Sequence, residues 1–205
     1  MNSLRAESIS KRFGSRDVLR DISCLLRSGS ITGIVGANGS GKSTLAKVLS
    51  GVLRPDAGIV ELSMDDSIID RADIPFHCGF VAPYLSLYDE FTPIELLELH
   101  GALHSKQFSR ECINNILVRV GLEVRGNSRV RTFSSGMRQR VALALAVSHE
   151  PAVLVLDEPS TTLDEDGRRM LSVEVLRAAE RGAIVIIASN DTREIEMCHN
   201  VIRVQ

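Results

Sequence analysis

The sequence predicts an α/β fold that combines a parallel core sheet, an N-terminal antiparallel β subdomain and an inserted helical subdomain. Uninterrupted apolar runs indicate strands buried on both faces, as in a parallel sheet. Alternation of apolar and polar residues near the N-terminus indicates half-buried antiparallel strands. A long middle segment repeats its apolar residues at helical spacing.

These patterns place the elements along the chain. The alternating segments, which predict the antiparallel strands, are 4–10, 18–26 and 58–63. The apolar runs, which predict the parallel strands, lie at 33–35, 80–82, 153–156 and 183–189. The helical segment covers 92–147, and the short run 201–205 predicts a final strand. A chain of 205 residues, 44% of them hydrophobic, can bury one sizeable core with one subdomain.

Composition excludes several classes of protein. The formal net charge of −2 provides no overall basic field for nucleic acid. No apolar run approaches the roughly 20 residues that span a bilayer, and residues 1–9 do not resemble a signal peptide. The four cysteines show no metal-ligand spacing, which favours reduced thiols in a cytoplasmic protein.

Two histidines in the helical segment, His100 and His104, lie one helical turn apart, as two metal ligands can. Leu99 and Leu103 flank them, which favours an ordinary amphipathic helix over a metal site. The pattern therefore predicts packing rather than metal binding at this place.

A glycine-rich loop is the most informative motif of the chain. Residues 36–44 read GANGSGKST, which has the form G-x-x-x-x-G-K-[ST]. An apolar run, 31–35, precedes the loop, and a helix-like run, 45–49, follows it. This strand–loop–helix context is the one in which the motif binds phosphate, and it argues against a glycine-rich turn without a ligand. The chain is therefore predicted to bind a nucleoside triphosphate.

Each part of this loop suits a phosphate ligand. Its glycines let the backbone turn tightly and aim N–H groups into a concavity. The predicted helix 45–49 adds the positive end of its dipole, and Lys42 adds a charge for the β- and γ-phosphates. Ser43 offers a hydroxyl to Mg²⁺, which keeps several waters and takes few protein ligands.

Two acidic residues, Asp157 and Glu158, end the apolar run at 153–156. Parallel sheets place active residues at this carboxyl edge. Asp157 is predicted to hold Mg²⁺ through its water shell, and Glu158 to accept a proton from the water that attacks the γ-phosphate. Standing alone, the pair would favour a solvated acidic turn instead.

A further motif precedes the acidic strand. Residues 133–137 read FSSGM and lead into a helix-like run. They resemble the signature motif, usually written LSGGQ, of ATP-binding-cassette (ABC) ATPases, and Ser134 and Gly136 match it directly. After the strand, 160–164 resembles the D-loop of the same family. Because these motifs occur in the family's order over nearly the whole chain, the chain is identified as a member of the ABC ATPase family.

This resemblance implies a P-loop NTPase core that binds ATP with Mg²⁺. The core would comprise residues 1–82 and 149–205, including the antiparallel β subdomain. Residues 83–148 would form the inserted helical subdomain, which carries the signature motif and touches the membrane subunit. In the family, the signature of one subunit closes over the nucleotide of the other, so that two ATP molecules are sandwiched in a head-to-tail dimer.

The signature motif also has a physical interpretation of its own. Ser134 can donate a hydroxyl, and Gly136 allows close approach of the backbone. Both lie at a predicted helix N-terminus, which attracts anions. A simple helix cap by Ser134 is the alternative, and one residue can serve both roles.

Three further positions bear on the site through the resemblance. Phe13 lies where the family places an aromatic ring that stacks on adenine, although it could instead be a satellite core residue. Pro83 replaces a glutamine that ligates Mg²⁺ in the family, and its side chain has neither donor nor acceptor. Asn190 replaces the family's switch histidine, and it keeps a neutral donor for the γ-phosphate but cannot become a cation. Hydrolysis that is slow or depends on a partner is therefore expected.

The predicted site divides by role. The catalytic residues are Lys42, Glu158 and Asn190, and the metal ligands are Ser43 and Asp157. The residues predicted to bind the nucleotide are Phe13, Gly36, Ala37, Asn38, Gly39, Ser40, Gly41, Lys42, Ser43, Thr44, Ser134 and Gly136.

Together these features predict the ATP-binding and ATP-hydrolysing subunit of an ABC transporter. It would work as a homodimer or heterodimer of ATP-binding subunits, held at the cytoplasmic inner face of the cell membrane by an integral-membrane permease. The short chain also resembles the ATP-binding subunit of the haem exporter of cytochrome c maturation. A soluble regulatory ABC ATPase, or an ATP-binding switch with slow turnover, is the alternative. The sequence does not specify the transported substrate or the direction of transport.

Overall fold

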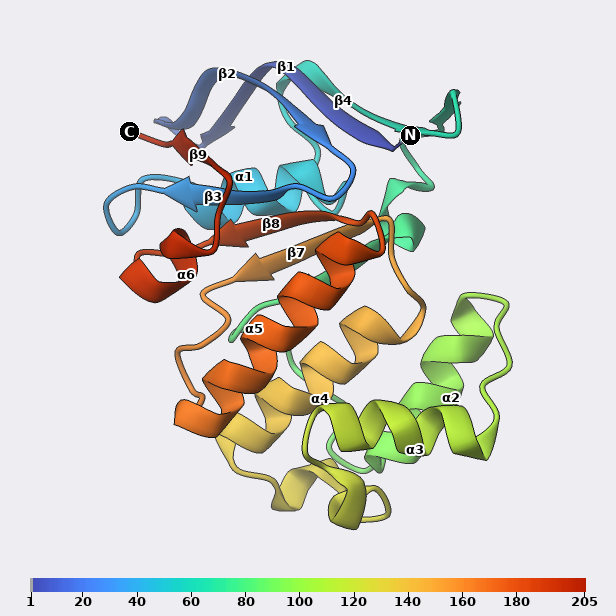
Figure 1. Ribbon diagram of the computed structural model, residues 1–205. Coiled ribbons are helices and arrows are strands. Elements are labelled where there is room, and N and C mark those ends of the chain that lie inside the picture. Colours follow the sequence, from blue (N-terminus) through green and yellow to red (C-terminus); the bar gives the residue numbers. More distant parts are fainter. Residues whose placement is uncertain (1) are drawn as a thin grey trace.

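The computed structural model describes residues 2–205 and contains two β-sheets with helices around them (Figure 1). The first sheet has four antiparallel strands in the order β2-β1-β4-β5. Its strands are β1 (Ser3–Phe13), β2 (Arg16–Arg27), β4 (Ala57–Met64) and β5 (Ser67–Ile69). The three strands predicted from alternation are confirmed. β5 was not predicted, because so short a strand shows no recognisable alternation.

The second sheet has five parallel strands in the order β6-β7-β8-β3-β9. They are β3 (Ile31–Val35), β6 (Cys78–Val81), β7 (Val153–Asp157), β8 (Ile184–Ala188) and β9 (Asn200–Arg203). Every residue of β3, β7 and β8 is buried, as the uninterrupted apolar runs predicted. Because the strands are parallel, their carboxyl ends lie along one edge, and the loops that follow them meet there.

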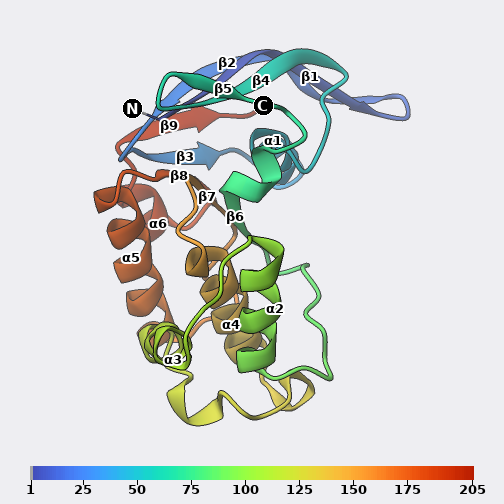
Figure 2. The ribbon, with the colours of Figure 1, turned by 90° about the vertical axis from the view of Figure 1, so that its right-hand side faces the viewer.

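The parallel sheet is the middle layer of the core. α1 (Lys42–Leu49) packs between the two sheets, with Leu45 and Leu49 fully buried beside Leu4 of β1 and Val155 of β7. α4 (Ser135–Ser148) and α5 (Glu165–Glu180) cover the opposite face of the parallel sheet (Figure 2).

α1 begins at Lys42, with Gly41 as its N-cap, and not at residue 45 as predicted. The first turn is polar, so the apolar pattern begins only one turn later. Two other helical elements that had not been predicted as helices, α5 and the short α6 (Thr192–Glu196), begin at aspartate N-caps.

The segment between β6 and β7 is mostly helical, as predicted. It holds α2 (Pro93–Leu103), α3 (Arg110–Arg119) and α4, and 3-10 turns occur at Glu123–Arg125 and Val130–Thr132, with another before β6 at Ile74–His77. Apolar side chains from these three helices form a cluster of their own. Arg119 of α3 pairs with the buried Glu174 of α5 (Nε to Oε1, 3.1 Å), which ties this segment to the core. The boundaries 1–82, 83–148 and 149–205 stay predictions.

α2 turns a different face inward than the sequence suggested. The predicted helix is present, but Leu99 and Leu103 are 39% and 66% exposed and do not lie on its buried face. Ile94 and Leu97 are buried instead, together with other residues of the helix. α2 carries apolar residues on more than one side, so tertiary packing decides which of them face the core.

Within residues 2–205, no helix is both long and apolar enough to cross a membrane. The cysteines at 24, 78, 112 and 198 are all free thiols. Burial raises the pKa of Cys24 to about 11 and that of Cys78 to about 12, so both stay protonated at neutral pH.

α4 approaches the parallel sheet closely at Gly79 of β6. A β-carbon there would lie 2.2 Å from the carbonyl oxygen of Ala146 and 3.1 Å from Cγ of Pro151. Gly79→Ala should therefore lower the free energy of unfolding, measured in urea, by about 3 kcal/mol, at the upper end of the usual cost of overpacking.

The control for this prediction is Gly14→Ala. Gly14 has a φ of 58° but open space around it, so only backbone strain changes at this position. That strain costs about 1 kcal/mol. Equal losses in the two variants would contradict the close packing of α4 on β6.

Candidate nucleotide-binding site

The glycine-rich loop lies between the carboxyl end of β3 and the first turn of α1. A β-carbon at Gly36 would lie 2.3 Å from the carbonyl oxygen of Val204 and 2.5 Å from Oγ of Ser40. Gly39 and Gly41 have positive φ angles of 78° and 107°. The loop conformation therefore requires glycine at these places, which explains the spacing of the motif.

A cavity of about 410 Å³ opens over this loop. It is lined by Asn38, Gly39 and residues 41–44, by Glu158, and by Arg16 and Val18 of β2. Arg16 and Val18 were not predicted to belong to the site. Arg16 donates a hydrogen bond from Nη2 to the carbonyl oxygen of Gly39 at 2.8 Å, so the β1–β2 hairpin supports the loop directly.

Lys42 is nearly buried, with 6% of its surface exposed. Its Nζ donates to the carbonyl oxygen of Gly36 at 2.9 Å. The ammonium group is therefore held against the loop, where a phosphate bound by the loop would meet it.

Asp157, at the carboxyl end of β7, is fully buried and accepts two hydrogen bonds. Ser43 Oγ donates to Oδ1 at 3.0 Å, and the hydroxyl of Tyr84 donates to Oδ2 at 2.8 Å. The two residues predicted as metal ligands, Ser43 and Asp157, are thus in contact.

Tyr84 was not predicted as a site residue. Its position directly after Pro83 was the only available signal, and its contact with Asp157 depends on the fold. The ammonium of Lys47 lies 4.2 Å from the centre of the Tyr84 ring. Burial and the hydrogen bond to Asp157 raise the pKa of the Tyr84 phenol, so its hydroxyl remains a donor at neutral pH.

Glu158 follows Asp157 and lines the cavity. Its φ of 46° is in the left-handed region, and its backbone N–H donates to the carbonyl oxygen of Ala188 at 2.8 Å. Burial raises the pKa of its carboxyl group, and the carboxylates of Glu194 and Asp157 raise it further, whereas Lys42 lowers it. A carboxylate with a raised pKa is a stronger base than an ordinary one.

Asn190 lies just beyond β8, at the same edge of the sheet. Its Nδ2 donates to Oδ1 of Asn38 in the glycine-rich loop at 3.1 Å. The structure therefore places the Asn190 side chain beside the predicted phosphate site, and its catalytic role stays a prediction.

The signature residues lie outside this cavity. Ser134 is the N-cap of α4, and its Oγ accepts from the N–H of Met137 at 3.3 Å. A β-carbon at Gly136 would lie 2.9 Å from the carbonyl oxygen of Thr162, in the segment after β7. Within the single chain, Ser134 and Gly136 therefore do not line the cavity over the glycine-rich loop.

Phe13, at the end of β1, is 52% exposed, so the alternative of a satellite core position is wrong. Lys11 Nζ lies 5.5 Å from the centre of its ring. Phe13 pairs across the hairpin with Arg16, which reaches the glycine-rich loop. The ring is free to contact a ligand, and stacking on adenine stays a prediction.

Known proteins resemble this chain in sequence and in fold. The ABC transporter family matches residues 19–161. The uncharacterised ABC transporter ATP-binding protein YdbJ of Bacillus subtilis is 34% identical, over 98% of this chain and 66% of its own length. The daunorubicin resistance ATP-binding protein DrrA3 of Streptomyces coeruleorubidus is 33% identical, over 95% of this chain and 62% of its own length. The chain thus spans about two thirds of the length of these curated relatives.

Solved structures of the same fold are also similar. The dimeric post-hydrolysis state of the ATP-binding cassette MJ0796, bound to ADP and Pi, superposes with a TM-score of 0.87 at 23% identity, over 98% of this chain and 94% of that one. The ATP-binding subunit of an ABC transporter also has a TM-score of 0.87 at 23% identity, over 98% of this chain and 85% of that one. These likenesses show that the fold is that of ABC ATPase domains.

Lys42→Ala tests the glycine-rich loop as the nucleotide site. The substitution removes a charge-assisted contact to phosphate, which is worth about 1.5–3 kcal/mol, so ATP affinity in a calorimetric titration should fall more than tenfold. Lys106→Ala is the control, because it removes the same charge from a lysine that bonds the His149 carbonyl oxygen, away from the loop. Unchanged affinity in Lys42→Ala would mean that the nucleotide binds elsewhere.

Proposed function

This chain belongs to the ABC transporter family, and on that premise we propose that it is the ATP-hydrolysing subunit of a transporter. It would convert ATP and water to ADP and phosphate, and so drive a separate membrane permease. One observation carries the proposal: residues suited to hold phosphate and residues suited to activate water meet at one sheet edge. Lys42 and Ser43 begin α1, Asp157 and Glu158 follow one another at the end of β7, and Asn190 lies beyond β8.

The oxygen atoms of Ser43 and Asp157 fit a magnesium ion. Mg²⁺ prefers hard oxygen ligands and keeps several waters, so Ser43 would ligate it with its hydroxyl and Asp157 would hold it through its water shell. The hydrogen bond of 3.0 Å between Ser43 Oγ and Asp157 Oδ1 brings these two side chains together. When bound with ATP, Mg²⁺ neutralises negative charge that develops on the phosphates.

We assign Glu158 as the general base. It accepts a proton from water as the water oxygen bonds to the γ-phosphorus, and the bond from that phosphorus to the bridging oxygen breaks to release ADP. Its raised pKa supports this assignment. Lys42 and the backbone N–H groups of the loop hold the phosphate oxygens, and Asn190 donates its amide N–H toward the γ-phosphate.

The site is proposed to be completed by a second subunit. Ser134 and Gly136 lie at the start of α4 and do not line the cavity over the glycine-rich loop of their own chain. On a partner subunit in head-to-tail arrangement, the same residues would present a hydroxyl and a helix N-terminus to the γ-phosphate. The partner is either a second copy or a different ATP-binding subunit.

The permease is proposed to dock near the loop that follows β6. Four large apolar side chains are exposed there, and such clusters mark interaction surfaces. They are Tyr84, Leu85, Tyr88 and Phe91. Because the Tyr84 hydroxyl bonds Asp157, a permease that moves this loop would also change the hydrogen bonding at the proposed metal site. Docking would hold the subunit peripherally on the inner face of the cell membrane.

The transported substrate is the least constrained part of the proposal. Haem export for cytochrome c maturation stays a prediction from resemblance. Relatives of this chain carry names of different transport, among them linearmycin resistance in Bacillus subtilis and sulfate or thiosulfate import in Chlorella vulgaris. A permease gene beside haem-handling genes would support haem export, whereas a permease gene beside drug-resistance genes would contradict it.

A slow ATP-binding switch is the second candidate function. The side chain of Pro83 has no atom that could ligate the metal, and the Asn190 amide cannot become cationic. ATP hydrolysis by the purified protein decides between the two: turnover supports the transporter subunit, and stable ATP binding without turnover supports the switch.

Glu158→Gln tests hydrolysis and the composite site together. The amide keeps the shape of the side chain but cannot act as a base, so turnover should fall by about 10²–10⁴-fold while ATP binding persists. ATP held between two subunits should then trap a dimer in size-exclusion chromatography. Glu180→Gln, an exposed position at the end of α5, is the matched control. A Glu158→Gln protein that binds ATP yet elutes as a monomer would contradict a composite site formed by two copies.

Tyr84→Phe tests the metal site. It keeps the ring under Lys47 but leaves one oxygen of the buried Asp157 without a donor. Loss of such a supporting hydrogen bond weakens metal binding about 10–100-fold, so the Mg²⁺ concentration needed for half-maximal turnover should rise at least tenfold. Tyr88→Phe, at an exposed tyrosine of the same loop, should leave it unchanged. If Tyr84→Phe and Tyr88→Phe need the same Mg²⁺ concentration for half-maximal turnover, Tyr84 does not support the metal site.

A further inference from the structure

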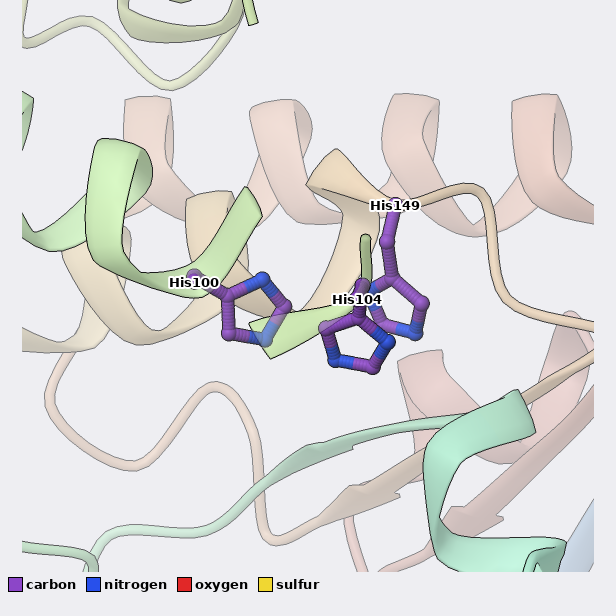
Figure 3. A group of neighbouring side chains, drawn as sticks. All are labelled: His100, His104 and His149. Carbon is purple, nitrogen blue, oxygen red and sulfur yellow. The ribbon is translucent and has the colours of Figure 1, made fainter. Parts of the chain in front are cut away.

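Three histidines gather near the amino end of β7 (Figure 3), whereas Glu158 of the nucleotide site follows the carboxyl end of the same strand. His100 lies on α2, His104 is the C-cap of α2, and His149 is the C-cap of α4 just before β7. The ring centres are 4.5 Å apart for His100 and His104, 4.0 Å for His104 and His149, and 5.1 Å for His100 and His149. One ligand nitrogen from each ring lies within 4.8 Å of the other two.

We propose that His100, His104 and His149 bind one divalent transition-metal ion, and that Zn²⁺ suits this donor set. Three neutral imidazoles with a fourth position open form a known coordination sphere for zinc. A cavity of about 600 Å³ adjoins His104 and His149 and would admit water to the fourth position. The site is separate from the Mg²⁺ site proposed at Ser43 and Asp157.

His149 provides an observation that is independent of the clustering. The residue is only 5% exposed, and both of its ring nitrogens are buried without a hydrogen-bond partner. Buried polar atoms in proteins nearly always have a partner. A metal ion would satisfy the lone pair of one nitrogen of this ring.

The surroundings of His100 select the tautomer that a metal ligand needs. Ser148 Oγ donates its hydrogen to the carbonyl oxygen of Leu145 at 2.8 Å. It therefore accepts from Nδ1 of His100, which lies 3.1 Å away and must carry a proton. The lone pair of His100 is then on Nε2. Ser148 orients the ring through its hydrogen bond, as residues behind the ligands do at known metal sites.

Binding requires local movements of the three rings. Two nitrogens at about 2.05 Å from a tetrahedral zinc ion stand about 3.3 Å apart, so the nitrogens must approach by up to about 1.5 Å. The stacked rings of His104 and His149, at an interplanar angle of 19°, must also open. His104 is partly exposed, and rotation about its broad χ2 well allows this movement.

Two charged residues near the cluster have opposite effects on a bound cation. Lys106, whose Nζ donates to the His149 carbonyl oxygen at 2.6 Å, repels a cation. Glu150 on the cavity wall opposes that repulsion.

The experiment titrates Co²⁺, as a spectroscopic substitute for Zn²⁺, into the full chain after treatment with a chelator and without nucleotide. One Co²⁺ per chain should bind and give the intense visible absorption of a tetrahedral site, and Zn²⁺ should abolish it by competition. The oxygen ligands of the Mg²⁺ site would give only weak absorption, because such sites are octahedral. Zn²⁺ should also raise the midpoint of thermal unfolding.

Variants assign the ligands. His104→Gln changes a partly exposed residue and should fold, yet it should weaken Co²⁺ binding at least about tenfold and remove the thermal shift. His100→Gln should do the same, and Ser148→Ala should weaken binding less because Ser148 acts through His100. His199→Asn is the matched control, since its Oδ1 can replace the Nδ1 that accepts from the N–H of Ile31 at 3.1 Å.

Two results would overturn the proposal. One is a wild-type protein that shows no tetrahedral Co²⁺ spectrum at micromolar concentrations. The other is a spectrum and affinity in His104→Gln and His100→Gln that equal those of the wild type and of His199→Asn.

Discussion

The nucleotide site depends on one fully buried carboxylate, that of Asp157. Such a group is costly to bury unless its oxygens are bonded, and here Ser43 bonds one and Tyr84 the other. These partners come from α1 and from the loop after β6, so satisfying Asp157 fixes both segments against β7. The residues that follow Asp157 then serve two surfaces: Glu158 lines the nucleotide cavity, while carbonyl oxygens further along contact the start of α4.

Much of the fold could be predicted because buried segments need apolar residues in a recognisable pattern. β3, β7 and β8 are buried on both faces, and this requires uninterrupted apolar runs. Elements without that requirement were missed or misplaced. The first turn of α1 is polar and so carries no apolar pattern, and β5 is too short to alternate. Leu99 and Leu103 show that the reverse inference, from an apolar residue to burial, can fail, since an apolar residue can also lie at the surface.

The site could be predicted wherever its residues adjoin one another in the chain. The glycine-rich loop has a fixed spacing because its backbone conformation requires glycine, and Glu158 follows a recognisable strand. Tyr84 and Arg16 could not be found this way, because each reaches the site across the fold from a different segment. The same holds for His149, which joins two histidines of α2 only after α4 has packed beside that helix.

In the proposed arrangement, one chain carries halves of two nucleotide sites, the loop half around Lys42 and the signature half around Ser134. Within residues 2–205, Ser134 does not line the cavity over the loop. The most direct test is ATP hydrolysis by a mixture of two variants. Lys42→Ala disables the first half. Ser134→Asp disables the second, because aspartate still caps α4 but repels phosphate. Each variant alone should be inactive, and mixing should restore turnover through mixed dimers with one intact site. A mixture whose rate equals the sum of the separate rates would contradict a site built from two chains.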